Sequence, residues 1–218
     1  GIVASPFMLT FLDPRSAVVV INTASLVILL LVINRDRKSL ENKEVLPMTV
    51  SGLAGVPFGV VALSSVHVGF LRSAIAFFTL MFAVGIFVSK YLNVRWRPFG
   101  MLTGFTVGAM LPAIGVGGPL LALSMISQGW DAQKIRVSLA TFFFVIESVA
   151  VAGYVVAGML TTERLLLVLI VTPGALLGFY LSDIIVTRLN EQMFRRTVIL
   201  IIIVTSLMIL VREGYTVL

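Results

Sequence analysis

An apolar stretch interrupted at its centre by glycine and proline constrains this chain more than any other feature. It runs from Phe99 to Ile126 with the sequence FGMLTGFTVGAMLPAIGVGGPLLALSMI. Glycine and proline at the density of its central segment, LPAIGVGGP, cannot continue a helix. The pieces on either side, 99–111 and 119–127, are each shorter than the roughly 20 residues that a helix needs to cross hydrocarbon. The sequence therefore predicts two half-helices joined by a break.

The composition places this break inside a membrane. The chain is 59% hydrophobic and 12% charged over 218 residues, with a mean hydropathy of +1.09, which lies outside the range of soluble domains. Unpaired backbone at membrane depth persists only where it is buried in protein or lines a watered cavity, and discontinuous helices mark the binding sites of secondary transporters. We therefore expect a binding site at mid-membrane in a multi-pass protein of the cell (plasma) membrane.

Charge and residue types argue against several other classes. The net charge is +6, but the basic residues lie in short loops between apolar runs, a pattern that orients helices in a bilayer and does not indicate nucleic acid binding. The sequence has no cysteine and one histidine, His67, so thiolate chemistry and a His-rich metal site are not expected. It has no Ser/His/Asp set and no HExxH motif. We expect neither an enzyme nor a bound cofactor or metal.

The apolar segments fall into two similar halves. A short half-helix is expected at 1–12, and full spans are expected at 16–34, 45–63, 70–88, 132–159, 165–181 and 197–211. Placing Asp13 on Asp131 brings Thr23 onto Thr141, and a shift of one residue brings the GxxxG step of Gly55 onto that of 174–178. This indicates a duplication, with a first repeat at 1–98 and a second at 99–218. The half-helix at 1–12 corresponds to the one after residue 118, so the segment 99–117 has no counterpart in the first repeat. We therefore expect about 20 residues of native sequence before the first glycine.

The positions of the basic residues decide between two topologies. If the segment 99–126 is a re-entrant hairpin, one face of the membrane collects twelve basic residues and the other keeps four. The twelve are Arg35, Arg37, Lys38, Lys43, Lys90, Arg95, Arg97, Lys134, Arg136, Arg188, Arg195 and Arg196, and the four are Arg15, Arg72, Arg164 and Arg212. If the segment crosses once, the division is nine against seven. The positive-inside rule favours the hairpin, and each repeat then has three spans, so the two repeats are inverted.

The break and the positions near it contain the candidate substrate-binding residues. Glycine amides that precede a helix N-terminus form a place for an anion. In an inverted pair the short half-helices of both repeats start near mid-membrane, and nearby polar side chains can complete the site, although such groups are ordinary interhelical hydrogen-bonders in most membrane proteins. The candidates are Gly1, Asn22, Thr23, Ser25, Gly115, Gly117, Gly118, Pro119 and Thr141. The glycines at 100, 104 and 108 are better explained by close helix packing.

One acidic residue, Glu147, lies near the middle of a predicted span. A charged side chain at that depth costs roughly 2.5 to 3.5 kcal/mol on insertion scales. Two interpretations remain open. Glu147 is either a proton-coupling residue or a protonated acid that is hydrogen-bonded to a neighbouring helix.

The order of these features resembles a known family. The second half has a small-residue half-helix, IGVGGP, a short apolar half-helix, a polar turn at 129–131 and a span with an early Thr141. The first half is similar, with Ser5-Pro6, the Asp13-Pro14 turn, Asn22-Thr23-Ala24-Ser25 and the stretch from Leu53 to Gly59. Together they resemble the TauE/SafE sulfite exporter family of membrane permeases. The resemblance covers the whole chain, and its weight lies in the order and repetition of loose glycine-rich motifs.

The resemblance implies a secondary transporter, in the first place an exporter, of small sulfur-containing anions such as sulfite or organosulfonates. Its partners would be a small anionic substrate and the lipid bilayer. Proton coupling, a homodimer, the identity of the anion and the direction of transport stay open. A non-transporting membrane scaffold or assembly subunit and an anion channel are the alternatives. A scaffold would need no polar lining at the breaks.

Overall fold

The described part of the chain is all-helical, as the sequence predicts. The computed structural model describes residues 8–9, 11–36, 42–88 and 99–186. Its helices are α2 (Pro14–Asp36), α3 (Asn42–Ser65), α4 (Val68–Val88), α5 (Phe99–Ile114), α6 (Gly118–Ser127), α7 (Ala132–Val156) and α8 (Thr162–Val186). Among these, α2, α3, α7 and α8 are long and apolar enough to cross a membrane. The predicted half-helix at 1–12, for the most part, and the predicted span at 197–211 lie outside the described residues.

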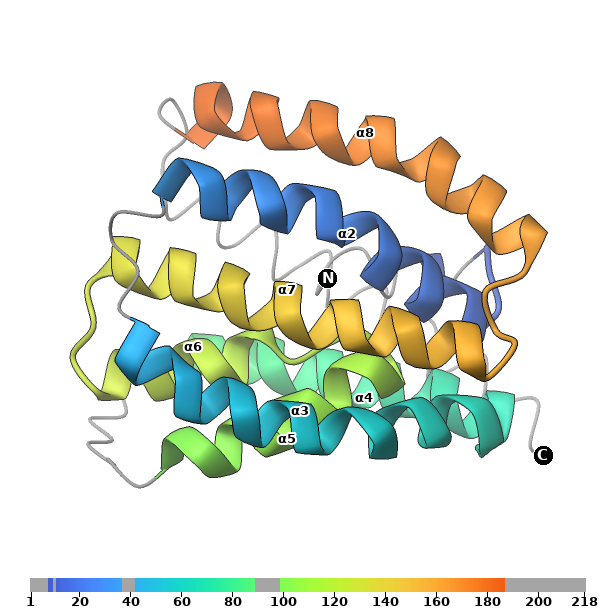
Figure 1. The fold of residues 1–218 in the computed structure, drawn as a ribbon, viewed down its shortest axis with the longest axis horizontal. Helices are drawn as coiled ribbons and strands as arrows, with labels where there is room; N and C mark the ends of the chain where they lie inside the picture. The colour runs from blue at the N-terminus through green and yellow to red at the C-terminus, as the bar shows by residue number, and fades with distance from the viewer. Residues whose placement is uncertain (1–7, 10, 37–41, 89–98, 187–218) are drawn as a thin grey trace.

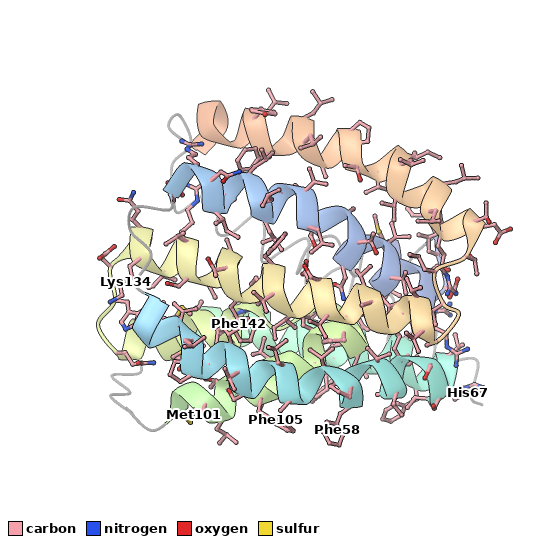
Figure 2. The ribbon with its side chains drawn as sticks, in the orientation of Figure 1. Phe58, His67, Met101, Phe105, Lys134 and Phe142 are labelled. Atoms are coloured by element: carbon pink, nitrogen blue, oxygen red, sulfur yellow. The ribbon has the colours of Figure 1, made fainter. Side chains whose placement is uncertain are left out.

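The helices form two groups that meet at α7. Helix α8 packs on α2, α2 packs on α7, and α7 packs on α3, which in turn packs on α5 (Figure 1). The outer face of the α3–α5 pair is apolar and exposed: Phe58 and Phe105 lie there edge to face, with ring centroids 5.9 Å apart (Figure 2). An exposed aromatic face of this kind suits contact with lipid in a membrane-spanning protein.

Glycines bring α3 and α5 into backbone contact. A Cβ atom added to Gly108 would lie 2.0 Å from the carbonyl oxygen of Gly52, and one added to Gly59 would lie 2.2 Å from the carbonyl oxygen of Ala109. No side chain larger than hydrogen fits at these positions without moving a helix. The packing role predicted for Gly108 is confirmed, and the first GxxxG step packs in the same way. The contacts show that the two helices run parallel.

The second GxxxG step, Gly174 and Gly178 on α8, does not make such a contact within the described residues. A Cβ atom added to either glycine would meet no atom within 4 Å there. Within the described residues, this step therefore makes no close helix contact. The motif permits close approach of a second helix, but it does not determine which helix approaches, and α2 contacts α8 elsewhere.

Helix α6 folds back along α5. The Thr103 hydroxyl of α5 donates to the Ser124 hydroxyl of α6 at 3.2 Å, and a Cβ atom added to Gly117 would lie 2.7 Å from the Val107 side chain. Pairing of 103 with 124 and of 107 with 117 makes the two helices antiparallel. The broken element thus returns to the end at which it started, which is the hairpin arrangement that the charge count favours.

Several helix ends differ from the predicted ones, among them the C-terminal ends of α5 and α8. Helix α5 continues three residues beyond the predicted end at Leu111, through Pro112 to Ile114. Proline removes only its own N–H, and the Gly115 amide still donates to the Leu111 carbonyl at 2.9 Å. Helix α8 continues beyond the predicted end at residue 181 to Val186, because the apolar residues 184–186 extend the helical pattern past Ser182 and Asp183.

Charged side chains gather at the two ends of the helices in the way the hairpin topology requires. At one end Arg136 of α7 pairs with Asp36 of α2 at 3.5 Å. At the other end Arg15 donates to the carbonyl oxygens of Leu63 and Val66 at 3.0 and 3.1 Å. Figure 2 shows Lys134 and His67 at these opposite ends. Residues 35–36 at the end of α2 and 134–136 at the start of α7 therefore lie at the same end of the molecule.

The described spans run in the directions that inverted repeats need. The contacts of Asp36 with Arg136 and of Ser25 with Glu147 make α2 antiparallel to α7. Arg164 at the start of α8 donates to the Ser16 hydroxyl at the start of α2 at 2.9 Å, so α8 runs parallel to α2. Because α3 returns from the far end of α2, α8 is also antiparallel to α3. The symmetry relation between the two repeats stays a prediction.

We predict that the end carrying Arg136 faces the cytoplasm. Since the sequence has no cysteine, single cysteines introduced one at a time are free of background labelling. Cysteines in the segments 35–44, 90–98, 134–136 and 188–196 should be protected from an impermeant maleimide in right-side-out vesicles, and one at Glu163 should be labelled. Labelling of 90–98 and 134–136 from opposite sides of the membrane would contradict the topology.

Candidate functional site

The candidate site is built around the break between α5 and α6. Gly115 follows the last residue of α5 with φ 69°, a left-handed conformation that glycine adopts without steric cost. Gly117 is the N-cap of α6, has no side-chain capping bond and is buried. Pro119 occupies the first turn of α6, where its missing N–H costs nothing. The glycine and proline positions thus give the local structure that the sequence predicts.

The N-terminus of α6 opens inside the helical body. The Leu121 amide makes the first recorded helical bond of α6, to the Gly117 carbonyl at 3.4 Å. The amides that precede it in a first turn have no partner within their own helix, and the helix dipole places partial positive charge there. At Gly118 an added Cβ atom would lie 3.6 Å from the Phe143 ring of α7, so this end of α6 faces α7.

Two side chains from neighbouring helices hold the end of α5. The Asn22 Nδ2 group of α2 donates to the Leu111 carbonyl at 3.2 Å and to the Tyr154 Oη atom at 2.9 Å. The Tyr154 hydroxyl of α7 donates in turn to the Pro112 carbonyl at 2.7 Å. The last carbonyls of a helix lack donors within it, so these bonds satisfy the end of α5 and fix the start of the break.

Asn22 keeps one further polar atom beside the break. Its side chain is 0% exposed, and its Oδ1 atom has no hydrogen-bond partner within the described residues. Because most buried polar atoms in proteins are bonded to protein or to ordered water, such an acceptor next to a helix break is suited to a ligand O–H group or to a water.

A second contact joins α2 and α7 one turn further along. The Ser25 hydroxyl lies against the Glu147 carboxyl oxygen Oε2 and also lies 3.0 Å from the Asn22 backbone carbonyl oxygen. Glu147 is 5% exposed. Ser25 is thus a partner on a neighbouring helix for Glu147, as one of the two interpretations requires. A proton-coupling role of Glu147 is compatible with the same contact.

The remaining predicted residues are less closely joined to the break. The hydroxyls of Thr23 and Thr141 donate to the carbonyl four residues earlier in their own helices, Val19 at 2.7 Å and Val137 at 2.9 Å. Both threonines are partly buried. Their recorded bonds are those of ordinary helical threonines. Gly1 lies outside the described residues.

Tyr154 is a residue of the site that the sequence analysis does not single out. A signal for it exists: Tyr154 lies in an apolar span, and a tyrosine buried there needs a partner for its hydroxyl. It is 0% exposed, and its bonds reach Asn22 and Pro112, which are far from it in the chain. Sequence spacing alone does not reveal those partners.

Comparison with known proteins identifies the family of the chain. A family profile described as "Sulfite exporter TauE/SafE" matches residues 1–209. No curated protein and no solved structure matches the chain. The profile match spans both predicted repeats and agrees with a multi-pass membrane protein that contains several long apolar helices. The chain therefore belongs to the TauE/SafE family of sulfite exporters, a family of membrane transporters.

Proposed function

We propose that this protein is a secondary transporter that exports small sulfur-containing anions such as sulfite or organosulfonates. The main observation behind this proposal is the position of the α6 N-terminus. Helix α6 begins at Gly118 within the helical body and is preceded by glycines. Neutral amide donors at a helix N-terminus favour an anion without neutralising it. Membership of the sulfite exporter family supports a sulfur oxyanion as the substrate.

In this proposal the anion binds at mid-membrane between the α6 break and the corresponding break of the first repeat. Amides replace part of the anion's hydration, and a site built from neutral donors releases its ligand more readily than one built on a buried arginine. The Asn22 Oδ1 acceptor of α2 can take the O–H group of a protonated anion. The hydroxyls of Thr23, Ser25 and Thr141 complete the shell when they exchange their present bonds for the ligand.

Transport into proteoliposomes tests the proposal. A panel of sulfite, sulfoacetate and other organosulfonates, with simple carboxylates for comparison, should give saturable flux that is confined to the sulfur anions. Counterflow separates a transporter from a channel. Only a carrier transiently accumulates labelled anion inside vesicles that are preloaded with unlabelled anion. A scaffold or assembly subunit would show no flux with any member of the panel.

We further propose that Glu147 carries the coupling proton, and we expect Glu147→Gln to abolish pH-driven accumulation while counterflow stays within about twofold of wild type. The amide keeps the size of the side chain but cannot bind and release a proton. The neighbouring Ser148 bonds only locally in the recorded contacts, to the Phe144 carbonyl, so Ser148→Ala is the matched control and should retain both activities. Wild-type pH dependence in Glu147→Gln would remove Glu147 from the coupling mechanism.

A further inference from the structure

The contacts of Ser25 favour one position for the hydrogen between Ser25 and Glu147. The Ser25 hydroxyl has one hydrogen and lies against two groups, the Asn22 backbone carbonyl at 3.0 Å and the Glu147 Oε2 atom. A backbone carbonyl can only accept. Each contact has a hydrogen of its own if Ser25 donates to the Asn22 carbonyl and a protonated Glu147 donates to Ser25. With an ionised Glu147, the two acceptors share the single Ser25 hydrogen.

The surroundings of Glu147 favour the same assignment. Its side chain is 5% exposed, and an unpaired carboxylate at such a position is costly. Among the described residues, the helices packed against α7 are α2, α3, α5 and α6. Helices α5 and α6 contain no titratable residue, and α3 has Lys43 and Glu44 only in its first turn. Apart from Glu147 itself, the charged residues of α2 and α7 lie at or next to the helix ends: Asp13, Arg15, Arg35 and Asp36 for α2, and Asp131, Lys134 and Arg136 for α7. The other titratable residue of α7 is Tyr154.

The same turn of α2 connects this acid to the break. The Asn22 backbone accepts the Ser25 bond, while the Asn22 side chain holds the Leu111 carbonyl and the Tyr154 hydroxyl. Tyr154 lies on α7, seven residues after Glu147, and it holds the Pro112 carbonyl. One hydrogen-bonded chain thus runs from the Glu147 carboxyl through Ser25, Asn22 and Tyr154 to the end of α5.

We propose that Ser25 is a positioning residue which holds the proton on Glu147 while α2 and α7 are packed together, and that loss of this proton loosens the break. On ionisation the Glu147 O–H bond breaks and the proton leaves to water. The Ser25 hydrogen turns from the Asn22 carbonyl to the carboxylate, and the buried charge favours separation of α2 and α7 at this level. Proton binding therefore favours the packed conformation over the loosened one. The size of this shift is set by the difference in proton affinity between the two conformations. This inference rests on the proposed coupling role of Glu147 and extends it to the break.

Infrared spectroscopy of the purified full chain at neutral pH, without substrate, tests the first half of the inference. Wild type should show a carboxylic-acid carbonyl band that Glu147→Gln removes. Ser25→Ala should shift that band, and Ser25→Thr, which retains a hydroxyl, should restore it. The inference is overturned if wild type has no band that depends on Glu147, or if Ser25→Ala leaves the band unchanged.

Reactivity of a single cysteine tests the link to the break. Val116 lies in the break and is 1% exposed, so Val116→Cys reports its opening. The rate of modification of this cysteine should rise from mildly acidic to alkaline pH in both backgrounds, because the thiol itself ionises. The rise should be several-fold larger when Glu147 is present than in the double variant with Glu147→Gln. Equal pH dependence in the two backgrounds would contradict the link.

The outcomes separate this inference from the proposed function. A protein that moves no sulfur anion but shows the Glu147 band and the pH-dependent cysteine keeps the inference about Ser25 and loses the proposed substrate. A protein that transports sulfite but lacks the band loses the inference alone.

Discussion

Gly108→Leu is expected to prevent α3 and α5 from packing and to leave little folded protein. An added Cβ atom at Gly108 would lie 2.0 Å from the Gly52 carbonyl oxygen and 2.6 Å from the Gly52 Cα atom. Both are backbone atoms, so no side-chain rotation relieves the collision. Overpacking with flexible neighbours costs about 1 to 3 kcal/mol. Displacing a backbone should cost more than that, against a typical total stability of about 5 to 15 kcal/mol.

A matched control is available on α8. Gly174 has no atom within 4 Å of an added Cβ among the described residues, so Gly174→Leu should fold like wild type. Size-exclusion chromatography of a detergent extract, followed by thermal unfolding, measures both variants. A monodisperse Gly108→Leu protein with wild-type thermal stability would contradict the close packing of α3 on α5.

The hairpin and its break could be predicted from sequence because their causes are local. Glycine and proline act on the backbone at their own positions, so the break near Gly115 follows from residue types alone. The return of the chain follows from the distribution of basic residues, which reports the side of each loop. The ends of α5 could not be predicted as well, because one proline can be accommodated when its neighbours keep their bonds, as Gly115 and Leu111 do.

Partners across the helices could not be predicted. Asn22, Ser25 and Glu147 were identified as candidates by type and depth, but nothing in their spacing pairs Ser25 with Glu147 or Asn22 with Tyr154. These pairings depend on the rotation of α2 against α7, which arises from packing of the whole core. The same reason explains why the first GxxxG step packs tightly while Gly174 makes no such contact within the described residues.

The second large effect is expected at Gly118, where leucine should remove anion binding from a protein that still folds. The leucine side chain would cover the first turn of α6 and keep an anion from its amides. Gly118→Ala is the control, since its Cβ atom would make an ordinary contact with Phe143 at 3.6 Å. Gly117 is a poorer test position, because any side chain there meets Val107 at 2.7 Å and disturbs the hairpin.

Calorimetric titration of sulfite into the purified wild type, Gly118→Ala and Gly118→Leu proteins tests the central claim most directly. Thermal unfolding of each protein first establishes that it is folded. We predict saturable binding to wild type, affinity within about threefold of wild type for Gly118→Ala, and at least a tenfold loss for Gly118→Leu, equivalent to about 1.4 kcal/mol or more. Wild-type affinity for sulfite in a folded Gly118→Leu protein would show that the anion does not bind at the α6 break.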